Sequence, residues 1–128
     1  MPPSVELDVE GDALPHARVA ELVTAALDSV GIGGGHVAVA FVDAGEIAAL
    51  NARWRGREGP TDVLSFPVDA AGDAAGPREL GDVVICPEHT EDLDEAVVHG
   101  VLHLVGMDHE TDEGEMLALQ AEIVSWLR

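Results

Sequence analysis

The sequence predicts one α/β domain, in which a single sheet of a few strands is covered by helices. Its 128 residues suit one domain built around a single core, so we expect residues 1–128 to form one unit. Short runs rich in β-branched residues alternate with stretches whose apolar residues recur every three or four positions. The links between these segments are short, which favours one sheet with helices packed on it.

Four runs are predicted to be strands. "SVELDVE" (4–10) alternates apolar and polar residues, as a strand with one buried face does. "GDVVIC" (81–86) is short and apolar, which is typical of a central strand. The other two are "HVAVAFV" (36–42) and "TDVLSFPV" (61–68), the latter ended by Pro67.

Two helices are predicted in the first half of the chain. One begins at Pro15, shows helical apolar periodicity, and is stopped by the glycines of "GIGGG" (31–35). The other is "AGEIAALNARW" (44–54), for which Asp43 is the expected N-cap. The small and acidic segment 69–80 is predicted to be a loop.

Two more helices are predicted in the second half. The first spans Glu91 to Val105, with Thr90 as N-cap, and ends at Gly106. Asp112 with Glu115 resembles a capping box at the start of the last helix.

The charge balance limits which partners the chain can attract. Aspartate and glutamate number 25 against six basic residues, all of them arginine, giving a formal charge of −19. A field of this sign repels nucleic acid at a distance, so attraction to RNA must be local. Three of the six arginines, Arg53, Arg55 and Arg57, fall within "ARWRGRE", although such a cluster is also common in a solvated loop.

Membrane and secretory classes are disfavoured. No stretch approaches the roughly 18 apolar residues that span a bilayer, and "MPPSVELDVEGD" lacks the basic and apolar run of a secretory signal. The single cysteine, Cys86, excludes an internal disulfide and is expected to be a small buried apolar residue. We therefore expect a cytoplasmic protein without a membrane partner.

The stretch "HGVLHLVGMDH" (99–109) predicts a metal site. His99 and His103 lie one helical turn apart, so both imidazoles project from one face and can bind one ion. Gly106 lets the chain double back, so that His109 can return as a third ligand. Such pairs are commonly incidental, but unsatisfied imidazoles would be costly in this apolar segment. Three imidazoles suit one Zn²⁺ per chain, or another divalent transition metal, and leave a position open for catalysis.

The spacing H-x3-H-x2-G-x2-H is also that of the metzincin proteases. In those enzymes the residue after the first histidine is the glutamate that acts as general base. Here this residue is Gly100, so a peptidase would lack its usual base. A zinc metallopeptidase with a borrowed base is therefore the second hypothesis.

Two segments in the correct order resemble the YbeY family of bacterial metal-dependent endoribonucleases. The histidine stretch resembles that family's H-G-x-L-H-L-x-G-Y-D-H signature, and "LNARWRGREGPTDVLSFP" (50–67) resembles its segment ending in TDVLSFP. "GDVVIC" is similar to the strand between them, and the match extends from about Val5 onward. The resemblance implies a small α/β sandwich with a mostly parallel four-stranded sheet and a metzincin-like metal helix.

The same resemblance implies a substrate and partners. Its zinc ligands match the three histidines of the motif, and the arginine implicated in RNA cleavage matches Arg55. The implied substrate is single-stranded RNA, including precursor 16S ribosomal RNA near its 3′ end, with a role in ribosome quality control. The small ribosomal subunit and its assembly factors are the implied partners, and DNA is not expected.

The arginine segment suggests how the phosphate would be bound. Arg55 would clamp the scissile phosphate and stabilise the charge that develops on it. Arg53 and Arg57 would bind flanking phosphates, although only some of the three can face one groove. Asp108 is interpreted either as an acceptor that orients an imidazole or as a turn cap.

Two departures from the family pattern stand out. Met107 occupies the position where the family usually has tyrosine, which removes an aromatic hydroxyl beside the site without an expected loss of metal. The interval between Cys86 and His99 is shorter than in other members, so partner contacts made there should differ.

A third hypothesis is a non-catalytic ribosome-assembly factor whose zinc only joins the helix to the turn. The charge of −19 gives it weight, because weak intrinsic affinity for RNA suits a protein that a partner delivers.

Several other residues are given structural interpretations. Trp54 could stack on a base but is expected in the core, as is Phe66. The histidines outside the motif, His16, His36 and His89, are expected to be exposed to solvent.

Overall fold

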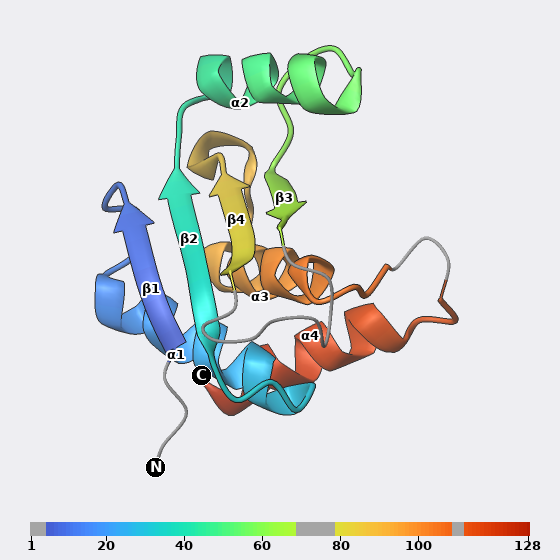
Figure 1. Cartoon of the computed structure of the whole chain (residues 1–128). Coiled ribbons are helices and arrows are strands. Elements are labelled where there is room, and N and C mark those ends of the chain that lie inside the picture. Colours follow the sequence, from blue (N-terminus) through green and yellow to red (C-terminus); the bar gives the residue numbers. More distant parts are fainter. Residues whose placement is uncertain (1–4, 69–78, 109–111) are drawn as a thin grey trace.

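Four strands form one mixed sheet at the centre of the molecule. The computed structural model describes residues 5–68, 79–108 and 112–128. The sheet has the order β1-β2-β4-β3, with β1, β2 and β4 parallel and β3 antiparallel to β4 (Figure 1). The strands are β1 (Val5–Glu10), β2 (Gly35–Phe41), β3 (Val63–Pro67) and β4 (Glu79–Ile85). The predicted mostly parallel four-stranded sheet is confirmed, and the apolar run at 81–86 lies in an inner strand.

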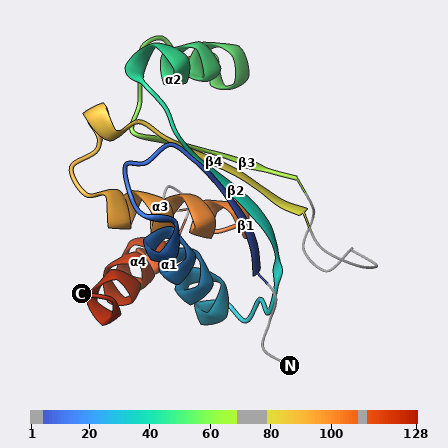
Figure 2. The ribbon, with the colours of Figure 1, turned by 90° about the vertical axis from the view of Figure 1, so that its left-hand side faces the viewer.

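The helices occupy two places around the sheet. Helices α1 (His16–Ser29), α3 (Leu93–Leu104) and α4 (Glu115–Trp126) lie on one face (Figure 2). Helix α2 (Ala44–Leu50) lies beyond the carboxyl end of β2 and continues into a π-helical turn, η1 (Asn51–Arg55). A short 3-10 turn, η2 (Pro87–His89), precedes α3. None of the helices in the described ranges is long and apolar enough to cross a membrane.

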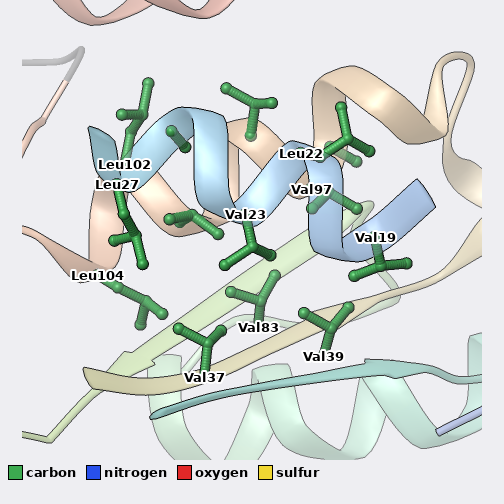
Figure 3. Packing of buried hydrophobic residues seen from close by; sticks show 14 of the residues in the cluster. Val19, Leu22, Val23, Leu27, Val37, Val39, Val83, Val97, Leu102 and Leu104 are labelled. Carbon is green, nitrogen blue, oxygen red and sulfur yellow. The ribbon is translucent and has the colours of Figure 1, made fainter. Parts of the chain in front are cut away.

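The main core fills the space between the sheet and the three helices on its face. In β2 the buried side chains alternate, so that Val37 and Val39 face this core. They meet buried residues of α1 and α3, as Figure 3 shows. Each fully buried leucine or valine contributes about 1.5–3 kcal/mol through the hydrophobic effect. This packing sets α3, the helix that carries the histidine motif, firmly against β4 and β3.

The predicted start of α3 is wrong by two residues. Asp92, and not Thr90, is the N-cap, and its carboxylate accepts a hydrogen bond from the amide of Glu95 at 3.2 Å. The hydroxyl of Thr90 instead donates to the carbonyl of Cys86 at 2.7 Å. Both residue types cap helices well, but Thr90 ends the preceding η2 turn, and Asp92 is the residue before the first turn of α3.

The predicted capping box of α4 is wrong, because Gly114 and not Asp112 is the N-cap and it has no side-chain cap. The helix begins at Glu115, after Gly114 with a φ of 101°. Asp112 accepts from the amide of Met116 at 2.9 Å, and the Glu115 carboxylate accepts from the amide of Glu113 at 2.6 Å. Both carboxylates bind amides at the start of the helix, but neither binds the amide of the other residue, so the reciprocal bonding of a capping box is absent. The predicted cap of α2 by Asp43 is confirmed.

Predicted burial is right for one of three residues near α2 and fails most clearly at Trp54. Cys86 is fully buried, as expected. Phe66 is half-buried and packs at the border of a second small cluster, made of Ile47, Leu64, Val84 and Cys86. Trp54 is 59% exposed, so its placement in the core is wrong. Its ring meets that of Phe66 edge to face, with centroids 6.4 Å apart.

His36 is not simply exposed, because it joins three strands. One ring nitrogen, Nδ1, lies 2.7 Å from a carboxylate oxygen of Glu79 in β4, and Nε2 lies 2.8 Å from Asp8 in β1. The hydrogen bond with Glu79, and then that with Asp8, raises the pKa of His36 above its ordinary value. The imidazolium ion is therefore favoured in the folded protein.

We predict that His36→Gln lowers stability in a pH-dependent way. Because the pKa of His36 is higher in the folded chain than in the unfolded chain, its protonation stabilises the fold. This stabilisation is complete below the pKa of the unfolded chain, about 6.5, and is lost as the pH rises through the pKa of the folded chain. Urea unfolding of both proteins between about pH 5.5 and 8.5 should show a stability difference that shrinks as pH rises. A difference that stays constant over this range would show that His36 acts only through packing.

Candidate active site

The histidine helix ends as the sequence predicts, at a left-handed glycine. Gly106 has a φ of 97°. Its amide donates to the carbonyl of His103 at 3.1 Å, and the amide of Met107 donates to the carbonyl of Leu102 at 3.1 Å. This pair of bonds is a Schellman motif, which satisfies the last carbonyls of α3 and turns the chain away from the helix axis.

His99 and His103 converge as two ligands of one ion would. Their Nε2 atoms lie 3.1 Å apart, and the ring planes meet at 74°. Two nitrogens bound tetrahedrally at about 2.0–2.1 Å from zinc lie roughly 3.3 Å apart, so the pair fits a shared metal. The third predicted ligand, His109, lies outside the described residues. Within those residues, no group of three histidine, cysteine or acidic side chains is arranged to hold a metal ion.

Gln120 of α4 joins this pair and was missed from the sequence. Its Oε1 lies 2.8 Å from Nδ1 of His99, across the contact between α3 and α4. A signal was available, because Gln120 is a polar residue on the apolar stripe that carries Met116 and Ile123, four residues before it and three after.

Gly100 lets α3 approach the sheet closely. A Cβ at this position would lie 2.4 Å from Cγ1 of Val83 in β4. On the neighbouring strand, the hydroxyl of Ser65 donates to the Gly100 carbonyl at 2.9 Å. Position 100 corresponds to the general base of metzincins, and the space that a glutamate side chain would need there is occupied by the sheet.

We predict that Gly100→Ala costs about 1–3 kcal/mol of stability, because the added methyl overpacks the contact with Val83. Gly45→Ala is the matched control, since it also lies in a helix but its Cβ would come no nearer than 3.4 Å to any neighbour. That change should be neutral or stabilise by about 0.5–1 kcal/mol. Equal effects of the two changes in urea unfolding would contradict the close approach.

A cavity of about 710 Å³ opens beside the histidines. Its walls come from α3 with its terminal turn, from β3, and from the loop that follows η1. Polar and charged residues in the wall include Arg55, Arg57, Ser65, His99, His103 and Asp108. Two segments that are far apart in the sequence, the arginine cluster and the histidine motif, thus face one space.

The arginine cluster divides between two places. Arg55 and Arg57 line the cavity, and both are exposed. Arg53 does not line it, and its guanidinium lies 5.1 Å from the centre of the Trp54 ring. The expectation that only some of the three share one groove agrees with this arrangement.

Asn51 holds the loop that presents these arginines. It is a buried polar side chain, 6% exposed, and its amide donates to the carbonyl of Gly59 at 3.0 Å. Its own carbonyl accepts from the amide of Arg57 at 3.3 Å. Asn51 was also missed from the sequence, where it stands within an otherwise helical pattern.

The other described arginines have structural roles. Arg18 of α1 is bound to Asp94 at 2.6 Å, and Arg128 pairs with Asp92, which ties the start of α3 to the end of α4. Arg78 lies outside the described residues. Among the residues that the structure describes, the arginines that line the histidine cavity are therefore Arg55 and Arg57.

Acidic groups at the cavity have roles in its turns. Asp62 accepts from the hydroxyl of Thr61 at 3.2 Å and from the amide of Val63 at 2.8 Å, at the entrance of β3. Asp108 lies in the wall, and its carbonyl accepts from the amide of Asp112 at 3.1 Å. An orienting role of the Asp108 carboxylate stays a prediction.

Comparison with known families decides the relationship. The family model described as endoribonuclease YbeY matches residues 8–128. The chain belongs to the YbeY family. Curated members include the endoribonuclease YbeY of Salinispora tropica, 40% identical over 93% of this chain and 89% of that protein. The protein of the same name from Thermobifida fusca is 40% identical over 87% of this chain and 85% of its own length.

Structure and length add to the comparison with YbeY proteins. The solution structure of TM1509 from Thermotoga maritima matches with a TM-score of 0.55 and 29% identity, covering 93% of this chain and 87% of that one. The alignment with the Salinispora protein spans 145 positions, more than the 128 residues here, so that relative contains residues that this chain lacks.

Proposed function

We propose that this chain is a metal-dependent endoribonuclease that cleaves single-stranded RNA in the cytoplasm. Membership of the YbeY family supports cleavage of RNA, because the curated relatives are named endoribonucleases. The observation that carries the proposal is the cavity in which a convergent histidine pair faces two arginines. The proposed substrate is precursor 16S ribosomal RNA near its 3′ end, in maturation and ribosome quality control.

His99 and His103 would hold one zinc ion, or another divalent transition metal, with His109 as the third ligand. The 3.1 Å separation of their Nε2 atoms supports this assignment. When bound, the ion would supply Lewis-acid chemistry at the scissile phosphate. Both rings are half-buried and line the cavity, so a metal held there would face the space that the arginines also line.

Arg55 would bind the scissile phosphate and Arg57 a neighbouring one. A guanidinium presents two parallel N–H donors to phosphate oxygens, and this geometry both orients the group and stabilises developing negative charge. The cavity also contains Glu58, Asp62 and Asp108, so attraction to RNA is confined to the arginine side. This local attraction within a chain of charge −19 supports delivery by the small ribosomal subunit or its assembly factors.

The proposal is tested by offering four substrates to the metal-loaded protein. A single-stranded RNA from the 16S 3′ region should be cut, while the same RNA in a duplex, the equivalent DNA, and casein should not. Cleavage of casein without cleavage of RNA would favour the peptidase hypothesis. Binding to small ribosomal subunits without cleavage of any substrate would favour the assembly-factor hypothesis.

A further inference from the structure

We propose that Gln120 is a positioning residue that fixes the tautomer of His99 and aims its Nε2 atom into the cavity. This role rests on the proposed metal site but concerns a residue of α4, outside both signature segments. The contact is short, 2.8 Å between Gln120 Oε1 and His99 Nδ1, and it is partly buried.

The chemistry of the pair determines where the proton lies. An amide oxygen only accepts, so Nδ1 of His99 must carry the hydrogen in this contact. In the neutral ring the lone pair is then on Nε2, the atom that faces Nε2 of His103 at 3.1 Å. Metal-bound histidines generally donate their other N–H to an acceptor that sets ring orientation and raises ligand basicity. Gln120 supplies such an acceptor from a different helix.

The position of Gln120 explains why it can act in this way. It is half-buried, on the stripe of α4 that packs against α3, with the buried Met116 and Ile123 on either side. The backbone of Gln120 is therefore held by the core packing of these two neighbours. The packing of α4 on α3 thus sets the orientation of the His99 imidazole, which lines the cavity.

The first test compares zinc affinity in three variants by competition with a chromophoric chelator. Gln120→Leu removes the acceptor and should weaken Zn²⁺ binding by about 10–100-fold. Gln120→Glu keeps an acceptor and should retain affinity within a few-fold. Glu122→Leu is the matched control on the exposed side of the same helix and should bind zinc as the wild-type chain does. Wild-type affinity in a folded Gln120→Leu protein would overturn the proposal.

The second test reads the tautomer in the metal-free wild-type chain, and it does not depend on the folding of a variant. Two-bond ¹H–¹⁵N correlation spectra of the imidazoles should show His99 protonated on Nδ1. Protonation on Nε2 instead would overturn the proposal.

The two experiments also separate this proposal from the proposed function. A wild-type chain that binds no zinc but shows the Nδ1–H tautomer would contradict the metal site and leave the orientation of His99 by Gln120 supported. Zinc binding that does not change in Gln120→Leu would contradict the positioning role alone.

Discussion

His103→Ala is expected to abolish cleavage of single-stranded RNA while leaving the fold in place. Loss of even an outer-shell partner of a metal typically costs 10–100-fold, so loss of a direct ligand should lower activity by more than about 100-fold. The fold should survive because the ring is only half-buried at the end of α3, beside the cavity. Cleavage rate and circular dichroism measure these two effects, and zinc content shows whether the metal is lost with them.

His89→Ala is the control for His103→Ala. His89 lies in η2, is exposed, and does not line the cavity, so its removal should change neither zinc content nor cleavage. Collapse of the fold in His103→Ala, reproduced by removing metal from the wild-type chain, would indicate a purely structural zinc. Full cleavage in a folded His103→Ala protein would contradict the assignment of this histidine.

Arg55→Ala is expected to lower the rate of RNA cleavage by about 100- to 1,000-fold, the loss seen when one donor to a developing oxyanion is removed. Zinc binding should not change, because Arg55 reaches the cavity from η1 and not from the histidine helix. Single-turnover cleavage, with zinc content measured on the same samples, separates the two effects.

Two further substitutions sharpen the test of Arg55. Arg55→Lys keeps the charge but loses the planar fork, so it should recover only part of the rate. Arg53→Ala removes the same charge from the same turn, but Arg53 lies over Trp54 and outside the cavity wall. It should therefore cost much less than Arg55→Ala, and similar losses for both would indicate a general electrostatic effect.

Local sequence patterns were sufficient for much of the fold and for part of the site. The four strands and the order of helices follow from hydrophobic periodicity, and the end of α3 follows from Gly106. The convergence of His99 and His103 follows from their spacing of four on a helix. These features depend on residues close together in the chain, and so the sequence displays them directly.

Trp54 shows where local periodicity fails. Ile47, Leu50, Asn51 and Trp54 follow helical spacing, which would place the tryptophan on the buried side of α2. The chain leaves α-helical geometry at Asn51 and forms a π-helical turn, which displaces the following residues around the axis. The same turn, ended by Gly56 with a φ of 65°, separates Arg53 from Arg55 and Arg57.

Contacts between distant segments could not be predicted. Gln120 and His99 are 21 residues apart and belong to different helices, and their meeting depends on how α4 packs on α3. His36 lies 43 residues from Glu79 and pairs with it only because β2 and β4 are neighbours in the sheet. Gln120 and His36 are polar residues within apolar sequence patterns, and this was the only sign in the sequence that each has a specific partner.

The most direct test of the account measures metal content and RNA cleavage on one preparation, before chelation, after complete metal removal, and after Zn²⁺ is restored. We predict about one zinc per chain, loss of cleavage on chelation, and recovery when zinc returns. Cleavage of single-stranded RNA that persists after complete metal removal would contradict it.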